Sequence, residues 1–408
     1  MRLSRSRRER ARRARQIALD GRVELWPQTG MTQHLVRRRS LVLFPIAAAA
    51  AACAPREAAQ GDGPGFAVDV VAGGLNYPWS LAFLPNGDAL ITEKMGGIRL
   101  LRADGTLAPE PVAGGPQNVF QEGQSGLHEV TVDPQFAENG FVYVSFLEGD
   151  TTANRIALYK ARFDGSALVD GQVIFRATPD KSDMGHPSAR ILFLPDETLL
   201  LAVGDGYDFK EQAQNLRSHL GKILRLTREG AAAADNPFVG RDDALPEIYS
   251  YGHRNTLGLA LDARDGAIWQ HENGPRGGDE LNLLKPGANY GWPLASYGID
   301  YDGTIITPNN QIPDAENAVA IFSPSIAPSG MVLYLGDAFP EWQGDFLIGA
   351  LTGAHLRRVR VRDNIAVLEE VLLHDRLARI RDVRVGPQGH VYLLTDSDAG
   401  EVLRVRPA

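Results

Sequence analysis

The sequence predicts an all-β fold, a six-bladed β-propeller, from three observations. A short apolar strand, a turn rich in Pro, Asp, Gly or Asn and a second apolar strand recur six times along the chain. No long segment with helical periodicity interrupts them. A β-sheet unit that cannot bury both of its faces alone must stack against neighbours, and such repeats are typical of propeller blades.

The six repeats follow one another at intervals of roughly 40 to 75 residues. They occupy residues 80–93, 129–146, 190–205, 258–273, 331–350 and 382–396. Further β-rich runs follow them, such as IALYKARFD and HLRRVRVRD. Before the first repeat, FAVDVVAG (66–73) can add a strand to the last blade and close the ring. We therefore predict one propeller domain over residues 66–408, with its function on loops at the mouth of the central channel.

Residues 1–53 differ from this body and predict export. Twelve of the 42 Lys and Arg residues lie in residues 1–39. From Met31 onward come a basic region (37–39), an apolar run (41–52) and small residues suited to cleavage, the pattern of a secretory signal. The apolar run is too short to span a bilayer, and Arg38-Arg39 also permits a twin-arginine signal. We expect a periplasmic protein in which residues 54–65 form a linker.

Cys53 is the only cysteine of the chain and directly follows the apolar run. A cysteine at this place resembles the lipid-modified cysteine of bacterial lipoproteins, although a chance cysteine near an ordinary cleavage site is the alternative. In either case the mature body has no disulfide to form. Any attachment to the membrane is therefore expected through a lipid anchor at Cys53 alone.

The body without residues 1–53 is acidic, with 30 Lys and Arg against 47 Asp and Glu, a formal charge of −17. Such a body repels nucleic acid and anionic membrane surfaces. A neutral substrate experiences no such repulsion. We therefore expect no nucleic-acid partner.

Residues 248–293 concentrate polar and turn residues: Arg254-Asn255, Gly274-Pro275, Asp279-Glu280 and Tyr290. Turn carbonyls beside carboxylates are ligands that Ca²⁺ prefers. An arginine next to an asparagine amide suits an anionic or carbonyl-bearing ligand. The alternative is a Gly- and Pro-rich surface loop of a β-protein.

Further polar groups stand in the long loops or at the edges of the repeats: Gln124, His186, Arg190, Ser296, Tyr301, Thr352, Arg379 and Arg381. By residue type alone they also permit structural roles. Arg379 and Arg381 could form a solvated strand face, and His186 could cap a turn. Glu280 could be a surface carboxylate and Tyr290 could pack between blades.

Three motifs of this stretch, YSYGHRN (249–255), ENGPRGGDELN (272–282) and NYGWP (289–293), resemble those of the soluble PQQ-dependent aldose sugar dehydrogenases. These are six-bladed propellers related to soluble glucose dehydrogenase, and the resemblance extends from about residue 66 to residue 408. It implies oxidation of an aldose sugar at its anomeric carbon to a lactone, by hydride transfer to PQQ with Ca²⁺ as Lewis acid. A separate electron acceptor is expected, because the chain has no C-x-x-C-H haem motif.

The resemblance also implies roles for individual residues. His186 is the expected general base, and Asp183 is near enough in sequence to orient it. Arg254 donates to the carbonyl being reduced. The remaining cofactor residues are Gln124, Asn255, Ser296, Tyr301, Thr352, Arg379 and Arg381, and the calcium residues are Gly274 and Pro275 through their carbonyls, with Glu280 and Tyr290.

One departure from the family pattern concerns Thr352, which stands where the family has a lysine that contacts PQQ. The loss of a cation weakens binding of a tricarboxylate unless His355 or a nearby arginine takes its place. Two alternatives stay open. One is a calcium-dependent lactonase, because six-bladed propellers also carry out that hydrolysis; the other, which Thr352 makes credible, is a propeller that binds a sugar or a protein and has lost PQQ.

Overall fold

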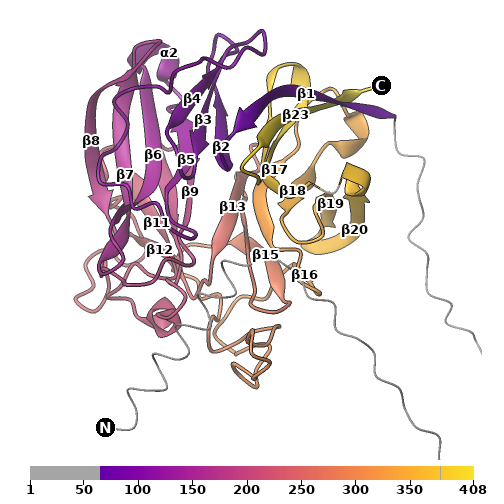
Figure 1. The fold of residues 1–408 in the computed structure, drawn as a ribbon. Helices are drawn as coiled ribbons and strands as arrows, with labels where there is room; N and C mark the ends of the chain where they lie inside the picture. Colours follow the sequence, from indigo (N-terminus) through magenta and orange to yellow (C-terminus); the bar gives the residue numbers. More distant parts are fainter. Residues whose placement is uncertain (1–64, 377) are drawn as a thin grey trace, which may run out of the picture. The chain divides into compact units, whose positions relative to one another are not determined.

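The computed structural model describes residues 65–376 and 378–408, and this part of the chain forms six antiparallel sheets arranged as the blades of a β-propeller (Figure 1). The predicted fold class is confirmed. The predicted export segment, residues 1–53 with Cys53, lies outside the described residues, as do residues 54–64 of the predicted linker.

The blades follow one another along the chain. Blade one contains β2 (Pro78–Phe83), β3 (Ala89–Glu93) and β4 (Ile98–Leu101). Blade two contains β5 (Leu127–Val132), β6 (Phe141–Gly149), β7 (Asn154–Phe163) and β8 (Leu168–Arg176). Blade three contains β9 (Ser188–Phe193), β10 (Thr198–Val203), β11 (Lys222–Thr227) and β12 (Ile248–Tyr251).

The second half repeats the arrangement. Blade four contains β13 (Thr256–Leu261), β14 (Ile268–Glu272), β15 (Asp279–Leu284) and β16 (Ala320–Phe322). Blade five contains β17 (Pro328–Leu333), β18 (Asp345–Ala350), β19 (His355–Arg362) and β20 (Ile365–Leu372). Blade six contains β21 (Ile380–Val385), β22 (Val391–Thr395), β23 (Gly400–Pro407) and β1 (Phe66–Leu75).

In the part of the chain that the structure describes, helical structure is confined to short turns between the strands. These are one α-helical turn, α2 (Phe136–Asn139), and 3₁₀ turns at Lys210–Gln214, Pro340–Trp342, His374–Arg376 and Pro387–Gly389. Within residues 65–376 and 378–408, no helix has the length and apolarity needed to cross a bilayer.

The strand pairing confirms the predicted repeats. Each of the six predicted units is the first pair of strands of one blade. The predicted closing strand is β1, which pairs with β23 from Phe66 opposite Pro407 to Leu75 opposite Gly400. Hydrogen bonds between the first and last strands of the described chain therefore close the ring.

The apolar core lies between neighbouring blades. Tyr143 and Leu158 of blade two pack in one cluster with Leu201 and Leu224 of blade three, and all four side chains are fully buried. Each blade thus covers a face that its neighbour would otherwise expose, which is why the repeats are stable only as a ring.

The first strands of the six blades are in contact around the centre of the ring. Among them Arg190 of β9 lies 2.7 Å from Glu129 of β5 and 3.0 Å from Asp382 of β21. Arg384 pairs with the same two carboxylates. Buried ions are tolerated when each has a partner of opposite charge, as each has here. The cluster joins blades two, three and six at the channel.

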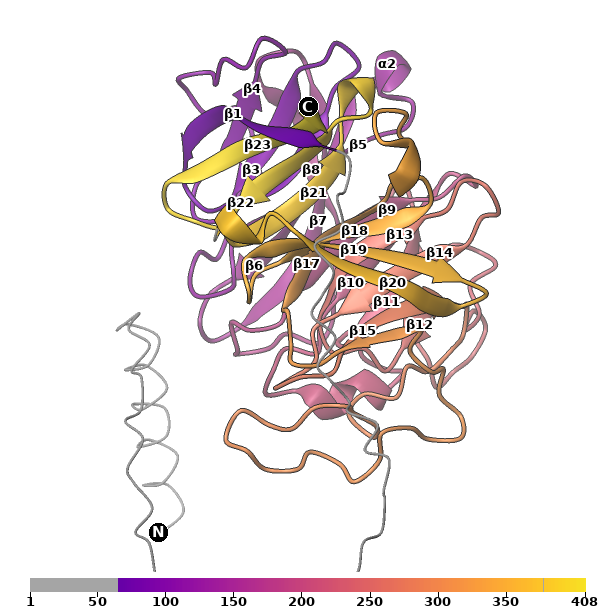
Figure 2. The ribbon, with the colours of Figure 1, turned by 90° about the vertical axis from the view of Figure 1, so that its right-hand side faces the viewer.

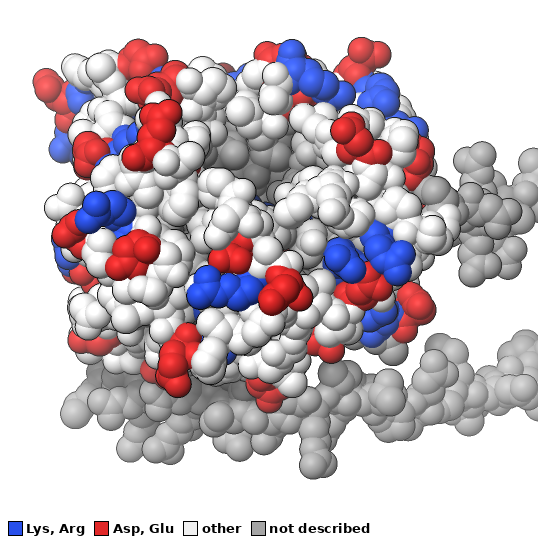
Figure 3. Space-filling model, turned by 90° about the horizontal axis from the view of Figure 1, so that it is seen from above, with Lys and Arg blue, Asp and Glu red and all other residues white. Residues whose placement is uncertain are grey.

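The two ends of the ring differ. Figures 1 and 2 show the long connection between β15 and β16 projecting from one end, whereas α2 lies at the other in Figure 1. Seen from above, the end with α2 has positive and negative side chains interspersed around a central hollow (Figure 3). The loops that lead into the first strands lie at the opposite end, as do the turns that join the second strands to the third and the long β15–β16 connection. Together these segments contain most of the predicted site residues.

Candidate active site at the mouth of the propeller

His186 lies in the loop before β9 and is paired with a buried carboxylate. Its Nδ1 is 2.7 Å from Oδ1 of Asp205, which follows β10. The Asp205 carboxylate also accepts hydrogen bonds from the backbone N–H of Tyr207 and from Nε1 of Trp292, both at 2.8 Å. Because Asp205 engages Nδ1, Nε2 is the nitrogen of His186 that remains to accept a proton.

The surroundings of His186 keep its ring neutral. Burial lowers the pKa of His186, and the positive charge of Arg254 lowers it further, while Asp205 opposes both effects. A histidine whose pKa is below its ordinary value is uncharged at pH 7 and can act as a base.

Asp183, the partner suggested by closeness in sequence, is not the residue that orients His186. Its Oδ1 accepts a hydrogen bond from the backbone N–H of Gly185, at 2.5 Å, and only its charge acts on the histidine. Asp205 lies nineteen positions beyond His186 and reaches it because β9 and β10 form a hairpin.

The backbone around this pair is strained. His186, Ser188 and Tyr207 have φ values of 46°, 58° and 61°, in the left-handed region that non-glycine residues rarely adopt. Such conformations cost about 1–3 kcal/mol each and tend to occur at functional sites. The Tyr207 ring, which is 42% exposed, lies 4.9 Å from the ring of His186.

Arg254 is buried beside this pair. Its Nη1 donates to the carbonyl oxygens of Asn273, at 3.0 Å, and Gly274, at 2.6 Å. Its Nη2 reaches the Tyr301 hydroxyl at 3.4 Å, while Nε is buried without a hydrogen-bond partner within the described structure. A buried donor without a partner is costly, so this guanidinium fits a ligand with an acceptor oxygen.

Asn255 and Gln124 connect the loops around His186. The Asn255 carbonyl oxygen accepts from the backbone N–H and the hydroxyl of Ser188, at 3.1 and 3.2 Å. The Gln124 side-chain oxygen accepts from the backbone N–H of His186 at 3.0 Å. Both residues therefore position the histidine loop, a contact that the sequence alone did not indicate.

Asp279 organises the predicted calcium loop. Its carboxylate accepts hydrogen bonds from the backbone N–H groups of Gly274, Ile326 and Ala327, at 2.9, 2.8 and 3.1 Å, and from the Ser325 hydroxyl. The backbone N–H of Thr352 donates to the Ile326 carbonyl at 3.0 Å. Asp279 thus joins the Gly274-Pro275 turn to the segment that contains Thr352.

The carboxylates of buried Glu272 and half-buried Glu280 belong to the lining of one small cavity of about 10 Å³. The cavity is lined by Arg254, Glu272, Asn273, Gly274, Pro275, Gly278, Glu280, Tyr290, Trp292, Ala295 and Ser296. Burial raises the pKa of Glu272 and Glu280, and the charge of Glu272 raises that of Glu280 further. Asn282 donates to Glu280 at 3.1 Å, and His253 lies 2.9 Å from Glu272. Two neighbouring carboxylates whose pKa values are raised in this way suit a cation, because a positive charge between them would stabilise their ionised forms.

A calcium ion would depend on carbonyls as well as carboxylates here. Within the described chain, no group of three or more His, Cys, Asp and Glu side chains is placed to bind a metal. The Tyr290 hydroxyl donates to the Leu283 carbonyl at 2.7 Å and its ring stacks on His253. The same hydroxyl accepts a hydrogen bond from the backbone N–H of Lys285 at 2.9 Å, so its backbone carbonyl is the oxygen of Tyr290 better suited to a cation.

Arg379, just before β21, and Arg381, within it, share one carboxylate. Asp396 accepts from Arg379 at 2.8 Å and from Arg381 at 2.9 Å. Although burial opposes it, the two arginines lower the pKa of Asp396 to about 2. Arg379 also donates to the Leu351 carbonyl at 3.1 Å, next to Thr352.

His355 does not replace the missing lysine. It is buried, and its Nε2 accepts a hydrogen bond from Arg357 at 3.3 Å. Burial and the charge of Arg357 lower the pKa of His355 to about 4, so that it is neutral at pH 7. A neutral imidazole offers no charge to a carboxylate.

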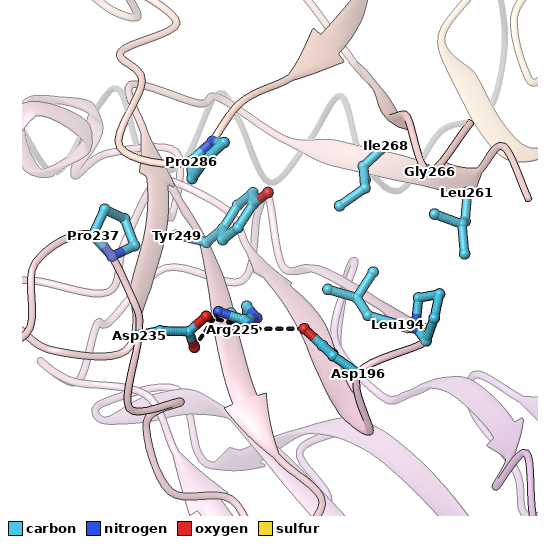
Figure 4. A pocket seen from close by; sticks show the side chains of 11 residues that line it. Leu194, Asp196, Arg225, Asp235, Pro237, Tyr249, Leu261, Gly266, Ile268 and Pro286 are labelled. Atoms are coloured by element: carbon cyan, nitrogen blue, oxygen red, sulfur yellow. Dashed lines mark hydrogen bonds and ion pairs between the residues drawn. The ribbon is translucent and has the colours of Figure 1, made fainter.

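A larger cavity, of about 370 Å³, lies at the far ends of the strands, between blades three and four. Figure 4 shows Tyr249, several prolines and aliphatic side chains around Arg225. The guanidinium already pairs with Asp196 at 2.5 Å and Asp235 at 2.8 Å. None of the predicted site residues lines this cavity, so size alone does not mark the site.

The comparisons with known proteins agree with this geometry. The family description "Glucose / Sorbosone dehydrogenase" matches residues 75–404. The aldose sugar dehydrogenase YliI of Escherichia coli (strain K12) is 39% identical over 346 residues, which cover 83% of this chain and 92% of that protein.

Solved structures give the same result. A crystal structure of a glucose dehydrogenase superimposes with a TM-score of 0.80 at 44% identity, covering 83% of this chain and 99% of the other. The PQQ-bound aldose sugar dehydrogenase of Streptomyces coelicolor superimposes with a TM-score of 0.69 at 30% identity, covering 84% and 100%. The chain therefore belongs to the glucose/sorbosone dehydrogenase family of sugar dehydrogenases.

Proposed function

We propose that this protein oxidises aldose sugars at the anomeric carbon to lactones, with PQQ and Ca²⁺ as cofactors. The observation that supports it most is the neutral His186, oriented by Asp205, beside a buried arginine whose Nε lacks a partner. A relative of known structure binds PQQ. PQQ, when bound, supplies the carbonyl that accepts the hydride, and Ca²⁺ polarises that carbonyl.

His186 removes the proton of the anomeric hydroxyl in this proposal. Asp205 accepts from Nδ1 and fixes the ring, so that the lone pair of Nε2 points away from the carboxylate. The imidazolium that forms is stabilised by the same carboxylate, which is fully buried. The hydrogen bonds from Tyr207 and Trp292 prevent the carboxylate from turning away.

Arg254 stabilises negative charge on an oxygen of the bound cofactor. Its guanidinium is held against the Asn273 and Gly274 carbonyls and lies 5.3 Å from the ring of Trp292. Because the group is oriented before the ligand arrives, little reorganisation is needed during the reaction. Arg379 and Arg381 bind carboxylates of the cofactor, and Gln124, Asn255, Ser296, Tyr301 and Thr352 complete its surroundings.

Gly274, Pro275, Glu280 and the carbonyl of Tyr290 would provide oxygen ligands for Ca²⁺. Glu272 would add a second carboxylate, a buried one that the sequence did not single out. A divalent cation in this cavity would compensate two carboxylates that burial otherwise disfavours. The expected sugar is neutral, since the acidic body gives no advantage to an anionic substrate.

A cofactor titration tests the proposal and separates it from the two alternatives. Apo-protein receives Ca²⁺, then PQQ, and is assayed with an aldose panel and a redox dye, and in parallel with a lactone. The proposed enzyme reduces the dye only when aldose and PQQ are both present. Lactone hydrolysis with metal alone would favour the lactonase, and sugar binding without either reaction would favour a binding protein.

A further inference from the structure

Lys94 lies beside the predicted cofactor arginines, on a different blade. It follows β3, and its backbone N–H donates to the Tyr77 carbonyl at 3.0 Å. The backbone N–H of Tyr77 in turn donates to the carbonyl of Ser397, the neighbour of Asp396, at 2.8 Å. These two bonds bring the end of β3 in blade one to the carboxylate that Arg379 and Arg381 share in blade six.

The Lys94 ammonium group points toward the loop of blade two that contains Gln124. Its Nζ donates to the Gly123 carbonyl at 3.2 Å and lies 5.1 Å from the centre of the Tyr77 ring. The backbone of the same loop is tied to Lys94, because the N–H of Leu127 donates to the Lys94 carbonyl at 3.1 Å. Lys94 thus stands between Gln124 and the arginine pair, at the edge of the predicted cofactor site.

The cluster has more positive than negative charge. Lys94, Arg379 and Arg381 interact with one carboxylate, that of Asp396. Burial lowers the pKa of Lys94, and the charge of Arg381 lowers it further, while Asp396 opposes. Positive charges brought together in a half-buried place destabilise one another unless an anion binds between them. Such an excess of one charge is typical of a binding site.

We propose that Lys94 supplies the positive charge that Thr352 does not, and that its ammonium group binds a carboxylate of PQQ. The inference rests on the proposed function. Arg379 connects the two positions, because it pairs with Asp396 and also donates to the Leu351 carbonyl, next to Thr352. Lys94 of blade one thus takes the place of the lysine that the family pattern has at position 352, on blade five.

The test is a titration of apo-protein with PQQ in excess Ca²⁺. Binding is monitored through the quenching of tryptophan fluorescence, so that the measurement reports binding and not turnover. Lys94→Met removes a charge-assisted hydrogen bond and should weaken PQQ about ten- to a hundredfold. Lys94→Arg keeps the charge and should bind PQQ nearly as the wild type does. Lys94→Gln repeats the test if the methionine variant does not fold.

Two further variants make the test specific. Lys285→Met removes a surface lysine that pairs with Glu316 at 2.8 Å and should leave PQQ affinity unchanged. Thr352→Lys should restore much of the lost affinity when combined with Lys94→Met, and should gain less in the wild-type background, because the two cations serve one ligand group.

The outcomes separate this inference from the proposed function. Tight PQQ binding by the wild type and equal binding by Lys94→Met and Lys94→Gln would overturn the role of Lys94 and leave the proposed function intact. No PQQ binding by the wild type would overturn both.

Discussion

At the scale of single residues, the account depends on the pair formed by His186 and Asp205. The His186→Ala variant should lose about 10² to 10⁴ in kcat, the usual contribution of a general base. PQQ affinity should change little, because the proposed role of the imidazole is to remove a proton from the sugar and not to bind the cofactor. Steady-state kinetics and PQQ titration check the two parts, and turnover at the wild-type rate would show that His186 is not the base.

Asp205 should matter far more than Asp183. Asp205→Asn keeps the size of the side chain but removes the charge that stabilises the imidazolium, and kcat should fall about a hundredfold or more. Asp183→Asn is the matched control, because Asp183 acts on His186 only through its charge. Equal losses in the two variants would contradict the assignment of Asp205 as the orienting carboxylate.

The lowered pKa of His186 predicts the acid side of the pH profile. Protonated His186 cannot accept a proton, so kcat/KM falls as pH decreases through the pKa of His186. Burial and Arg254 place this pKa below the ordinary value of about 6.5. The decrease of kcat/KM on the acid side should therefore have its midpoint below the ordinary histidine pKa of about 6.5. A midpoint at or above that value would show that the ring is not held neutral.

At the scale of elements, Asp279 holds two loops of the site together. Asp279→Ala would leave the N–H groups of Gly274, Ile326 and Ala327 without their acceptor. Unpaired buried donors cost about 1–3 kcal/mol each, so the free energy of unfolding should fall by several kcal/mol, measured in urea. Asp279→Asn retains one acceptor oxygen and should lose less; an unchanged midpoint in both variants would contradict this role.

The sequence predicted elements better than it predicted contacts within the site. The alternation of apolar strands and turns identified all six blades and the strand that closes the ring, because strand pairs joined by short turns are local. The partner of His186 was missed because Asp205 is adjacent only through the hairpin of β9 and β10. Lys94 was missed because it is near enough to feel the charge of Arg381 only in the folded ring, where blade one follows blade six, although the chain separates the two residues by most of its length.

At the scale of the whole molecule, we predict that residues 1–53 direct export and membrane attachment. The basic, apolar and Ala-Ala-Cys sequence predicts lipid attachment at Cys53. Cys53→Ala should release the protein from the membrane fraction, because the lipid is the proposed anchor. Fractionation of cells expressing each form is the measurement, and an unchanged membrane-bound share in Cys53→Ala would contradict the lipid anchor.

The central claim is that the anomeric carbon of an aldose is oxidised in a reaction that needs PQQ. The most direct measurement follows glucose labelled with ¹³C at carbon 1 by NMR, with apo-protein, Ca²⁺ and a dye, before and after PQQ is added. The account predicts that the anomeric signals are lost and that signals of the lactone and its hydrolysis product, the acid, appear only after PQQ is added. Anomeric signals that persist with PQQ bound, or oxidation that proceeds equally without it, would contradict the account.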